Sequence, residues 1–310
     1  MTDREPHCLP DTDSSTSDTR RAHERNREDA HWVPVIVKRT DEARRHPDDI
    51  LATAIDEGLE QLQRPTVSLA LSSVAAGLIL GFTAMAVAVV TVAMDGVAAP
   101  LLVRLGVALV YPMGFVLCLM SGTELYTEHT ATAVYPILDR KASPTQLLRL
   151  WLIVIAGNMV GAFSSACLLV LAEPVIGARE GYLAIGRHLL AASPPALLVS
   201  AILAGWLMAL GAWLILATPP TVSQIVSIWI VTFLIGLGGL HHSIAGAVEI
   251  FTASLVADRV VIAEVGRFLG LALFGNLIGG SLFVAVLNYG HIRQSQTPPD
   301  NRPEDGPGEP

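Results

Sequence analysis

The sequence Gly157-Asn158-Met159-Val160-Gly161 occurs again 118 residues later as Gly275-Asn276-Leu277-Ile278-Gly279, each time inside a long apolar stretch. The same offset places Gly122-Thr123-Glu124-Leu125 on Leu240-His241-His242-Ser243, and both of these segments interrupt an apolar run with polar residues. Paired interruptions at corresponding positions are typical of membrane proteins built from two repeats. The pattern predicts two similar halves whose polar breaks meet at one site.

Charged residues lie mostly outside this repeat. Of the 48 Asp, Glu, Lys and Arg residues, 31 fall in residues 1–65 and 291–310, which leaves 17 for the 225 residues between them. A soluble domain carries roughly 25% charged residues, so this composition excludes an ordinary cytosolic enzyme. Without a basic patch it also excludes a nucleic-acid-binding protein. The central region is predicted to lie in a lipid bilayer.

Six apolar segments have the length of a membrane span. They cover residues 66–94, 101–138, 146–172, 194–217, 222–257 and 266–289. The second and fifth contain the polar breaks, and such backbone is tolerated at membrane depth only where it is buried in protein or lines a cavity. Three spans per half give the halves opposite orientations. The predicted fold class is an all-α membrane protein with six transmembrane helices, an inverted 3+3 repeat and interrupted second and fifth helices.

The regions outside the spans divide into three parts. Residues 1–46 and 291–310 are polar, lack a hydrophobic periodicity and are expected to be disordered. Residues 47–65 are predicted to form an amphipathic helix with Leu51, Ile55 and Leu62 on one face. Lys and Arg collect on the side of the chain termini, so both tails and this helix are expected to be cytoplasmic.

The residues at these breaks resemble those of the formate/nitrite transporter family, from about Ile50 to Tyr289. The matching motifs are Glu57-Gly58…Arg64-Pro65, Thr123-Glu124-Leu125-Tyr126-Thr127, Arg149-Leu150-Trp151, His242-Ser243-Ile244-Ala245 and Gly275-Asn276-Leu277-Ile278-Gly279-Gly280. The resemblance is greatest to a divergent branch of bacterial inner-membrane proteins. It implies an aquaporin-like protomer, a homopentamer with one pore per protomer, and passage of small monovalent anions or their conjugate acids.

The resemblance also implies roles for particular residues. The central pore histidine matches His242, the hydrogen-bonding threonine of the second-span loop matches Thr127, and the aromatic residue before it matches Tyr126. Ser243 and His241 flank the histidine and Glu124 lies in the first break, which makes them further candidates for the pore.

Several positions depart from the family pattern. A lysine that many members place before the fourth span is Leu189 here, and Arg187 or His188 are candidates to attract anions in its place. Two family asparagines are Gly205 and Gly246, and the glutamate before the central histidine is His241. These departures bear on the substrate more than on the fold.

His242 is the main candidate for chemistry. An imidazole at the midplane can offer a hydrogen bond or a proton to a carboxylate or nitrite oxygen, and protonation of the anion would remove the cost of carrying its charge through an apolar constriction. In the alternative, purely structural interpretation, His242 only caps the second half-helix. His241 is either a second donor or faces the neighbouring helix, because adjacent helical residues point about 100° apart.

The embedded acids have structural alternatives as well. Glu124 is expected to cap the half-helix after the first break. Glu128 and His129 either pair with each other or reach an aqueous vestibule, and Glu249 is either a proton partner of His242 or a helix-to-helix hydrogen-bonding group. Half-helices beginning near Thr127 and Ser243 would also direct unpaired N–H groups toward an anion.

The predicted function is a bacterial inner-membrane channel or transporter for a small weak-acid anion, with protons, anions and lipid as its partners and no cofactor. A neutral-solute pore of the same fold is an alternative, made plausible by the missing lysine. A metalloenzyme using His241, His242 and Glu249 or Glu124 is disfavoured because adjacent histidines lack the i, i+4 spacing of ligands on one helix face. A non-conducting scaffold is the third alternative.

Overall fold

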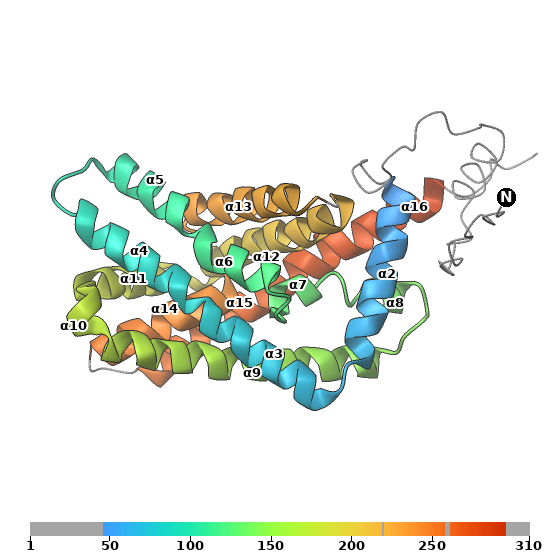
Figure 1. Ribbon diagram of the computed structural model, residues 1–310, viewed down its shortest axis with the longest axis horizontal. Helices are drawn as coiled ribbons and strands as arrows, with labels where there is room; N and C mark the ends of the chain where they lie inside the picture. The colour runs from blue at the N-terminus through green and yellow to red at the C-terminus, as the bar shows by residue number, and fades with distance from the viewer. Residues whose placement is uncertain (1–45, 219, 258–260, 296–310) are drawn as a thin grey trace, which may run out of the picture. The chain divides into compact units, whose positions relative to one another are not determined.

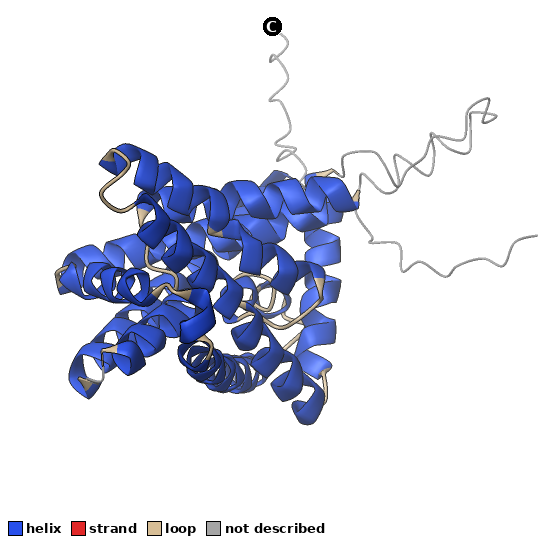
Figure 2. Cartoon of the chain, turned by 60° about the vertical axis from the view of Figure 1, so that its left-hand side comes forward, coloured by secondary structure: helices blue, strands red, loops and turns tan. Residues whose placement is uncertain are grey.

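The computed structural model describes residues 46–218, 220–257 and 261–295, and every element in these ranges is a helix (Figure 1). The turned view in Figure 2 shows the same helical packing joined by short loops. The tails predicted at residues 1–45 and 296–310 lie outside the described residues. The helices are α2 (Pro47–Gln63), α3 (Thr66–Ile79), α4 (Gly81–Met94), α5 (Pro100–Val110), α6 (Pro112–Met120), α7 (Tyr126–His129), α8 (Tyr135–Leu138), α9 (Pro144–Leu171), α10 (Glu173–Ile176), α11 (Arg179–Ala191), α12 (Pro194–Ala217), α13 (Thr221–Gly238), α14 (Ser243–Val256), α15 (Ile262–Gly280), the π-helix η1 (Ser281–Val286) and α16 (Leu287–Ser295).

Six helical stretches of the described chain are long and apolar enough to cross a membrane, as predicted. They are Thr66–Met94, Pro100–Met120, Pro144–Leu171, Pro194–Ala217, Thr221–Gly238 and Ile262–Gln294. The second and fifth stretches end at the polar breaks, and the chain resumes in α7 and α14. Many of these helices begin at a proline, whose fixed φ and missing N–H suit the first helical turn.

Two helix pairs form the framework around the breaks. α3 packs along α9, and α12 packs along α15. Glycines permit the close approach: a Cβ atom on Gly77 would lie 2.3 Å from the Asn158 carbonyl oxygen, and a Cβ atom on Gly205 would lie 2.3 Å from the Asn276 carbonyl oxygen. Both pairs therefore bring the backbones together next to the repeated asparagines, which is what the repeat in the sequence predicts.

Helix α2 is the predicted amphipathic helix. Leu51, Ile55 and Leu62 are buried, and the helix packs on α8, α9, α12 and α16. Figure 1 shows α2 and α16 at one end of the helical unit and α10 and α11 at the other. Helix α11 was not predicted, because its short amphipathic sequence carries neither a span-length apolar run nor a strong cap.

The C-terminal end of the last span differs from the prediction. Residues 291–295, assigned to a disordered tail, continue α16 as far as Ser295. Asp139 explains part of this order, because Arg293 Nη2 donates to its carboxylate over 2.5 Å and the Tyr289 hydroxyl donates over 3.1 Å. Partners distant in the sequence thus extend a helix whose own composition is polar.

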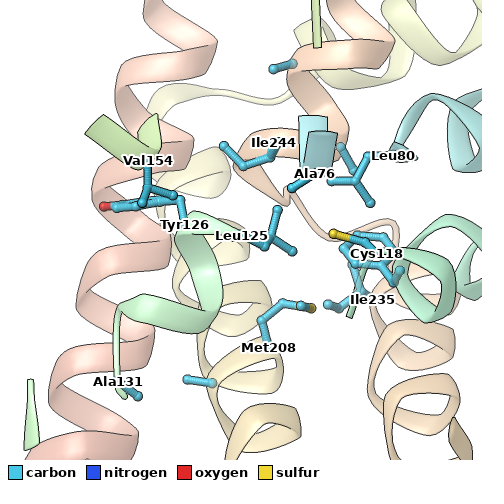
Figure 3. Packing of buried hydrophobic residues seen from close by; sticks show 14 of the residues in the cluster. Ala76, Leu80, Cys118, Leu125, Tyr126, Ala131, Val154, Met208, Ile235 and Ile244 are labelled. Atoms are coloured by element: carbon cyan, nitrogen blue, oxygen red, sulfur yellow. The ribbon is translucent and has the colours of Figure 1, made fainter. Parts of the chain in front are cut away.

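The core between the framework pairs is apolar (Figure 3). Leu125 from the first break, Ile244 from α14 and Met208 from α12 lie close together in this view, with Cys118 and Ile235 to one side. All five are buried. The polar breaks are therefore surrounded by hydrocarbon side chains.

Candidate functional site

The two breaks have the same backbone course. Gly122 and Gly239 both adopt a left-handed conformation, with φ of 65° and 60°, which glycine tolerates without strain. Three residues later Leu125 and His242 are extended, and α7 and α14 begin directly after them. The breaks thus correspond at an offset of 117, not the 118 that relates the asparagines, so the predicted alignment of the breaks was wrong by one residue.

Two buried asparagines fix the breaks to the framework helices. Asn158 Oδ1 accepts the Tyr126 N–H over 2.9 Å, and Asn158 Nδ2 donates to the Glu124 carbonyl over 2.9 Å. Asn276 repeats both bonds, accepting the Ser243 N–H over 2.8 Å and donating to the His241 carbonyl over 3.1 Å.

Each asparagine is also tied to its partner helix. Asn158 Nδ2 donates to the Ser73 carbonyl on α3, and Asn276 Nδ2 donates to the Ala201 carbonyl on α12. Both asparagines are fully buried, and every amide oxygen and nitrogen has a partner. The central amide of the GNxxG motif is therefore what positions the polar backbone, a role that the repeat alone did not predict.

His242 joins the two breaks. Its Nδ1 accepts the Ala245 N–H over 3.2 Å, and its Nε2 lies 2.9 Å from the Thr127 hydroxyl oxygen. A ring nitrogen that accepts a hydrogen bond carries no proton, so this pattern assigns the proton of the neutral ring to Nε2, which donates to Thr127. His242 thus caps α14 through Nδ1 and also contacts the first break through Nε2, although these two roles were predicted as alternatives.

His242 is almost completely buried. The ring is 1% exposed, and Phe115 contacts it edge-on with ring centroids 4.9 Å apart. Ser243 is fully buried, and among the described residues its hydroxyl has no hydrogen-bond partner. The Ile244 N–H likewise meets no acceptor in the described chain. The Ser243 hydroxyl and the Ile244 N–H, both next to His242 in the chain, are thus buried polar groups without a partner among the described residues.

The expected pair of half-helix N-termini is only partly present. α14 has 14 residues, whereas α7 is a single turn of four. The first N–H of each helix is already taken by Asn158 or Asn276. A substantial helix dipole at the centre therefore comes from α14 alone.

The remaining candidates lie around this centre. The Tyr126 ring is buried in the apolar core, and its hydroxyl donates to the Leu273 carbonyl over 3.4 Å (Figure 3). His241 turns toward α12, with its Nδ1 2.8 Å from the Ser200 hydroxyl, and it stacks on His188 with ring centroids 6.2 Å apart. His241 thus contacts the neighbouring helix α12, which is one of the two alternatives predicted for it.

Glu124 does not cap α7, contrary to prediction, because that helix has no side-chain cap. Its carboxylate instead contacts Arg64 at the end of α2 and His129 Nε2. His129 Nδ1 lies 2.8 Å from Gln61 Oε1 on α2. A charged partner from a distant helix outcompetes the local cap, and the result is a polar connection between α2 and the first break.

A cavity of about 400 Å³ lies beside α2. We call it the α2 cavity; its lining includes Glu57, Glu128, Thr53, Thr132 and Gln224. Of the two alternatives for Glu128, the structure has the side chain lining this cavity, and His129 contacts Glu124. Partial desolvation, reinforced by the neighbouring Glu60 and Glu124, raises the pKa of the Glu57 carboxyl.

A second cavity, of about 410 Å³, lies near α11. We call it the α11 cavity; its lining includes Arg104, Tyr111, His188, Leu189, Gly239 and Glu249. His188 therefore lines the α11 cavity, whereas Arg187 lines a separate cavity with Glu264. Arg104 was not among the predicted site residues, because a lone arginine near the start of an apolar helix belongs to no motif.

A family model described as formate/nitrite transporter matches residues 48–290. The chain belongs to the formate/nitrite transporter family. Inner membrane protein YfdC of Escherichia coli is 30% identical over 246 residues, which cover 78% of this chain and 77% of that protein. A probable formate transporter of Methanothermobacter thermautotrophicus is 28% identical and covers 68% of this chain and 84% of that protein.

Solved structures show the same fold. A chain described as an FNT family ion channel superposes with a TM-score of 0.69 at 20% identity, covering 81% of this chain and all of that chain. A pentameric formate channel with formate bound gives a TM-score of 0.63 at 19% identity, covering 74% of this chain and 98% of that chain. The predicted family and six-helix fold are confirmed.

Proposed function

We propose that this member of the family conducts small monovalent weak-acid anions of the formate and nitrite class, with His242 and Thr127 at the point of selection. The observation that carries the proposal is the 2.9 Å contact between His242 Nε2 and the Thr127 hydroxyl, which brings the two breaks together in a buried place. The names of the formate-transporting relatives support the substrate class. We assign the chain no catalytic reaction.

The chemistry follows from the donors around the imidazole. An anion that leaves water for this apolar interior loses several kcal/mol of hydration unless polar groups replace it. The Thr127 and Ser243 hydroxyls are donors that can reach a planar carboxylate or nitrite, and His242 Nε2–H becomes a further donor when the anion replaces the Thr127 oxygen as its acceptor. The apolar walls, Phe115 among them, exclude a larger hydrated ion. Selection among anions then depends on the shape of the anion and on whether both of its oxygens can accept hydrogen bonds.

The cellular setting and assembly form part of the proposal. The six apolar stretches and the inner-membrane relative support a bacterial inner-membrane location, and the basic residues near α2 support a cytoplasmic position for both termini. Large apolar side chains remain exposed on the spans, among them Val67, Leu152, Leu168 and Phe274. The pentameric neighbour supports a homopentamer with such surface at lipid and at subunit contacts.

The test is uptake of labelled formate and nitrite by proteoliposomes, with urea as a neutral solute of similar size. Wild type should carry the anions, and His242→Leu should lose most of this flux. Thr252→Val is a matched control, since Thr252 is a buried α14 residue whose hydroxyl, among the described residues, bonds to the Val248 carbonyl alone. Urea flux without anion flux would establish the neutral-solute pore instead, and equal anion flux in wild type and His242→Leu would refute the role of the histidine.

A further inference from the structure

The α11 cavity brings two basic side chains to the turn that leads into the centre. The Arg104 Nε donates to the Leu237 carbonyl over 2.5 Å, and His188 Nε2 lies 3.5 Å from the Gly239 carbonyl oxygen. Both carbonyls belong to the C-terminal end of α13, only a few residues before His242. The negative end of that helix dipole favours cations at this place.

The bond to Leu237 leaves the outer part of the guanidinium free. In the described part of the chain no carboxylate pairs with Arg104, and its Nε is the only nitrogen with a hydrogen-bonding partner. The two terminal nitrogens form a planar fork that matches two carboxylate or nitrite oxygens. Arg104 and His188 are both exposed, so an ion arriving from water has access to them.

Other polar groups of the cavity lie deeper. Glu249 is the single carboxylate among its lining residues and is 6% exposed, and Tyr111 beside it is also buried. Leu189, the residue after His188, also lines the cavity; it is apolar and packs with Ile250 and Phe268. The fixed positive charge of the cavity therefore belongs to Arg104.

We propose that Arg104, assisted by His188, is an anion-loading site in which a small monocarboxylate or nitrite is held before it moves to His242. This inference rests on the proposed function and adds a residue that determines capture. The site raises the local anion concentration electrostatically, so it acts on the concentration dependence of transport more than on the maximal rate.

The first experiment measures initial formate uptake by proteoliposomes at increasing formate concentrations. Arg104→Gln should raise KM roughly fivefold, the scale of one partly exposed charge contact, with maximal rate largely retained. Arg104→Lys should restore part of the effect because it keeps the charge. Arg187→Gln is the control: it removes a positive charge next to His188 in the sequence, but Arg187 lines the separate cavity that contains Glu264. The KM of Arg187→Gln should match that of wild type.

Ionic strength supplies a second readout. Raising it with an impermeant salt should shrink the KM difference between wild type and Arg104→Gln, since exposed charges are screened within about 8 Å at 0.15 M. An unchanged KM in Arg104→Gln overturns the proposal. A lower maximal rate at unchanged KM also overturns it, because that result assigns Arg104 a structural role through the Leu237 carbonyl.

A transport-independent measurement separates this inference from the proposed function. In a chain with Cys118 and Cys167 replaced by alanine and Cys8 by serine, Val103→Cys places one thiol in the α11 cavity. The ratio of labelling rates by anionic and cationic methanethiosulfonates reports the local potential. Arg104→Gln should lower that ratio several-fold even if no formate flux is found, and an unchanged ratio refutes the loading site by itself.

Discussion

Thr127 and His242 are 115 residues apart in the sequence, yet the Thr127 hydroxyl oxygen lies 2.9 Å from His242 Nε2. Thr127→Val keeps the shape of the side chain and removes this contact, leaving a buried N–H without an acceptor at a cost of about 1–3 kcal/mol. Formate flux should fall strongly while Thr127→Ser retains it. Thermal unfolding in detergent and liposome flux check both parts, and equal flux in Thr127→Val and Thr127→Ser would argue against the hydroxyl.

The proton assignment on His242 predicts the charge carried by transport. Because Nδ1 accepts the Ala245 N–H, protonating that nitrogen would break the cap of α14, so the ring should serve as a neutral hydrogen-bond donor. Formate should then pass as an anion, and planar-bilayer recordings should show a reversal potential that follows the formate gradient. Electroneutral uptake with one proton per formate would show that the ring, or another group, supplies the proton.

The asparagines should matter for stability. Asn276→Leu leaves the buried Ser243 N–H and two carbonyls without the partners described above, each costing about 1–3 kcal/mol when unpaired. Asn158→Leu should behave alike in the other half. Gln63→Leu, which removes an exposed amide from α2, is the matched control. Thermal unfolding should separate the two asparagine variants from it, and a melting temperature like that of the control would mean that water replaces the lost bonds.

Gly205 should tolerate no side chain. A Cβ atom there would lie 2.3–2.7 Å from three backbone atoms of Asn276, and backbone cannot rotate away as a flexible side chain would. Gly205→Asn, the residue found in other family members by the resemblance, should cost about 3 kcal/mol or more and reduce the folded yield. Gly270→Asn faces open space and should fold normally in the same size-exclusion assay.

The attachment of α16 should depend on pH. Burial alone would raise the pKa of Asp139, but hydrogen bonds from Lys141 and Arg293 outweigh it and hold the pKa below its usual value. The stabilisation is therefore present above the ordinary carboxyl range and is lost as the pH falls through the lowered pKa. Protection of α16 from an acid-active protease should decrease below about pH 4.

Asp139→Asn should remove that pH dependence and leave α16 less protected at pH 7. Asp95→Asn, an exposed acid at the end of α4, should leave the profile unchanged. If protease protection of α16 in Asp139→Asn depended on pH as it does in wild type, other groups would be responsible for the pH dependence.

The spans and breaks were predictable because they depend on local composition: hydrocarbon thickness sets the length of an apolar run, and polar glycine-bearing sequence marks an interruption. The repeat predicted that the two breaks meet, and the family resemblance placed Thr127 and His242 at the pore centre, but the contact between these two side chains was not predicted. Nothing local in either segment specifies a partner on the other.

The missed features share a physical cause. Arg104 bonds to a carbonyl oxygen 133 residues away, and a backbone acceptor carries no side-chain signature. Glu124 was expected to accept backbone N–H groups at the start of α7, but its carboxylate contacts Arg64 from the end of α2 and the side chain of His129 at the other end of α7. The offset of 118 failed at the breaks because the second half has one residue more between its break and its asparagine than the first half.

The unequal linings of the two cavities have an electrical consequence. An anion approaching past α11 meets Arg104 and His188, whereas one approaching past α2 meets Glu57 and Glu128. If the same anion gradient is applied first in one direction and then in the other, the α11 cavity and the α2 cavity should fill with anion to different extents. We expect the open protein to rectify, passing more anion when loading occurs at the arginine end.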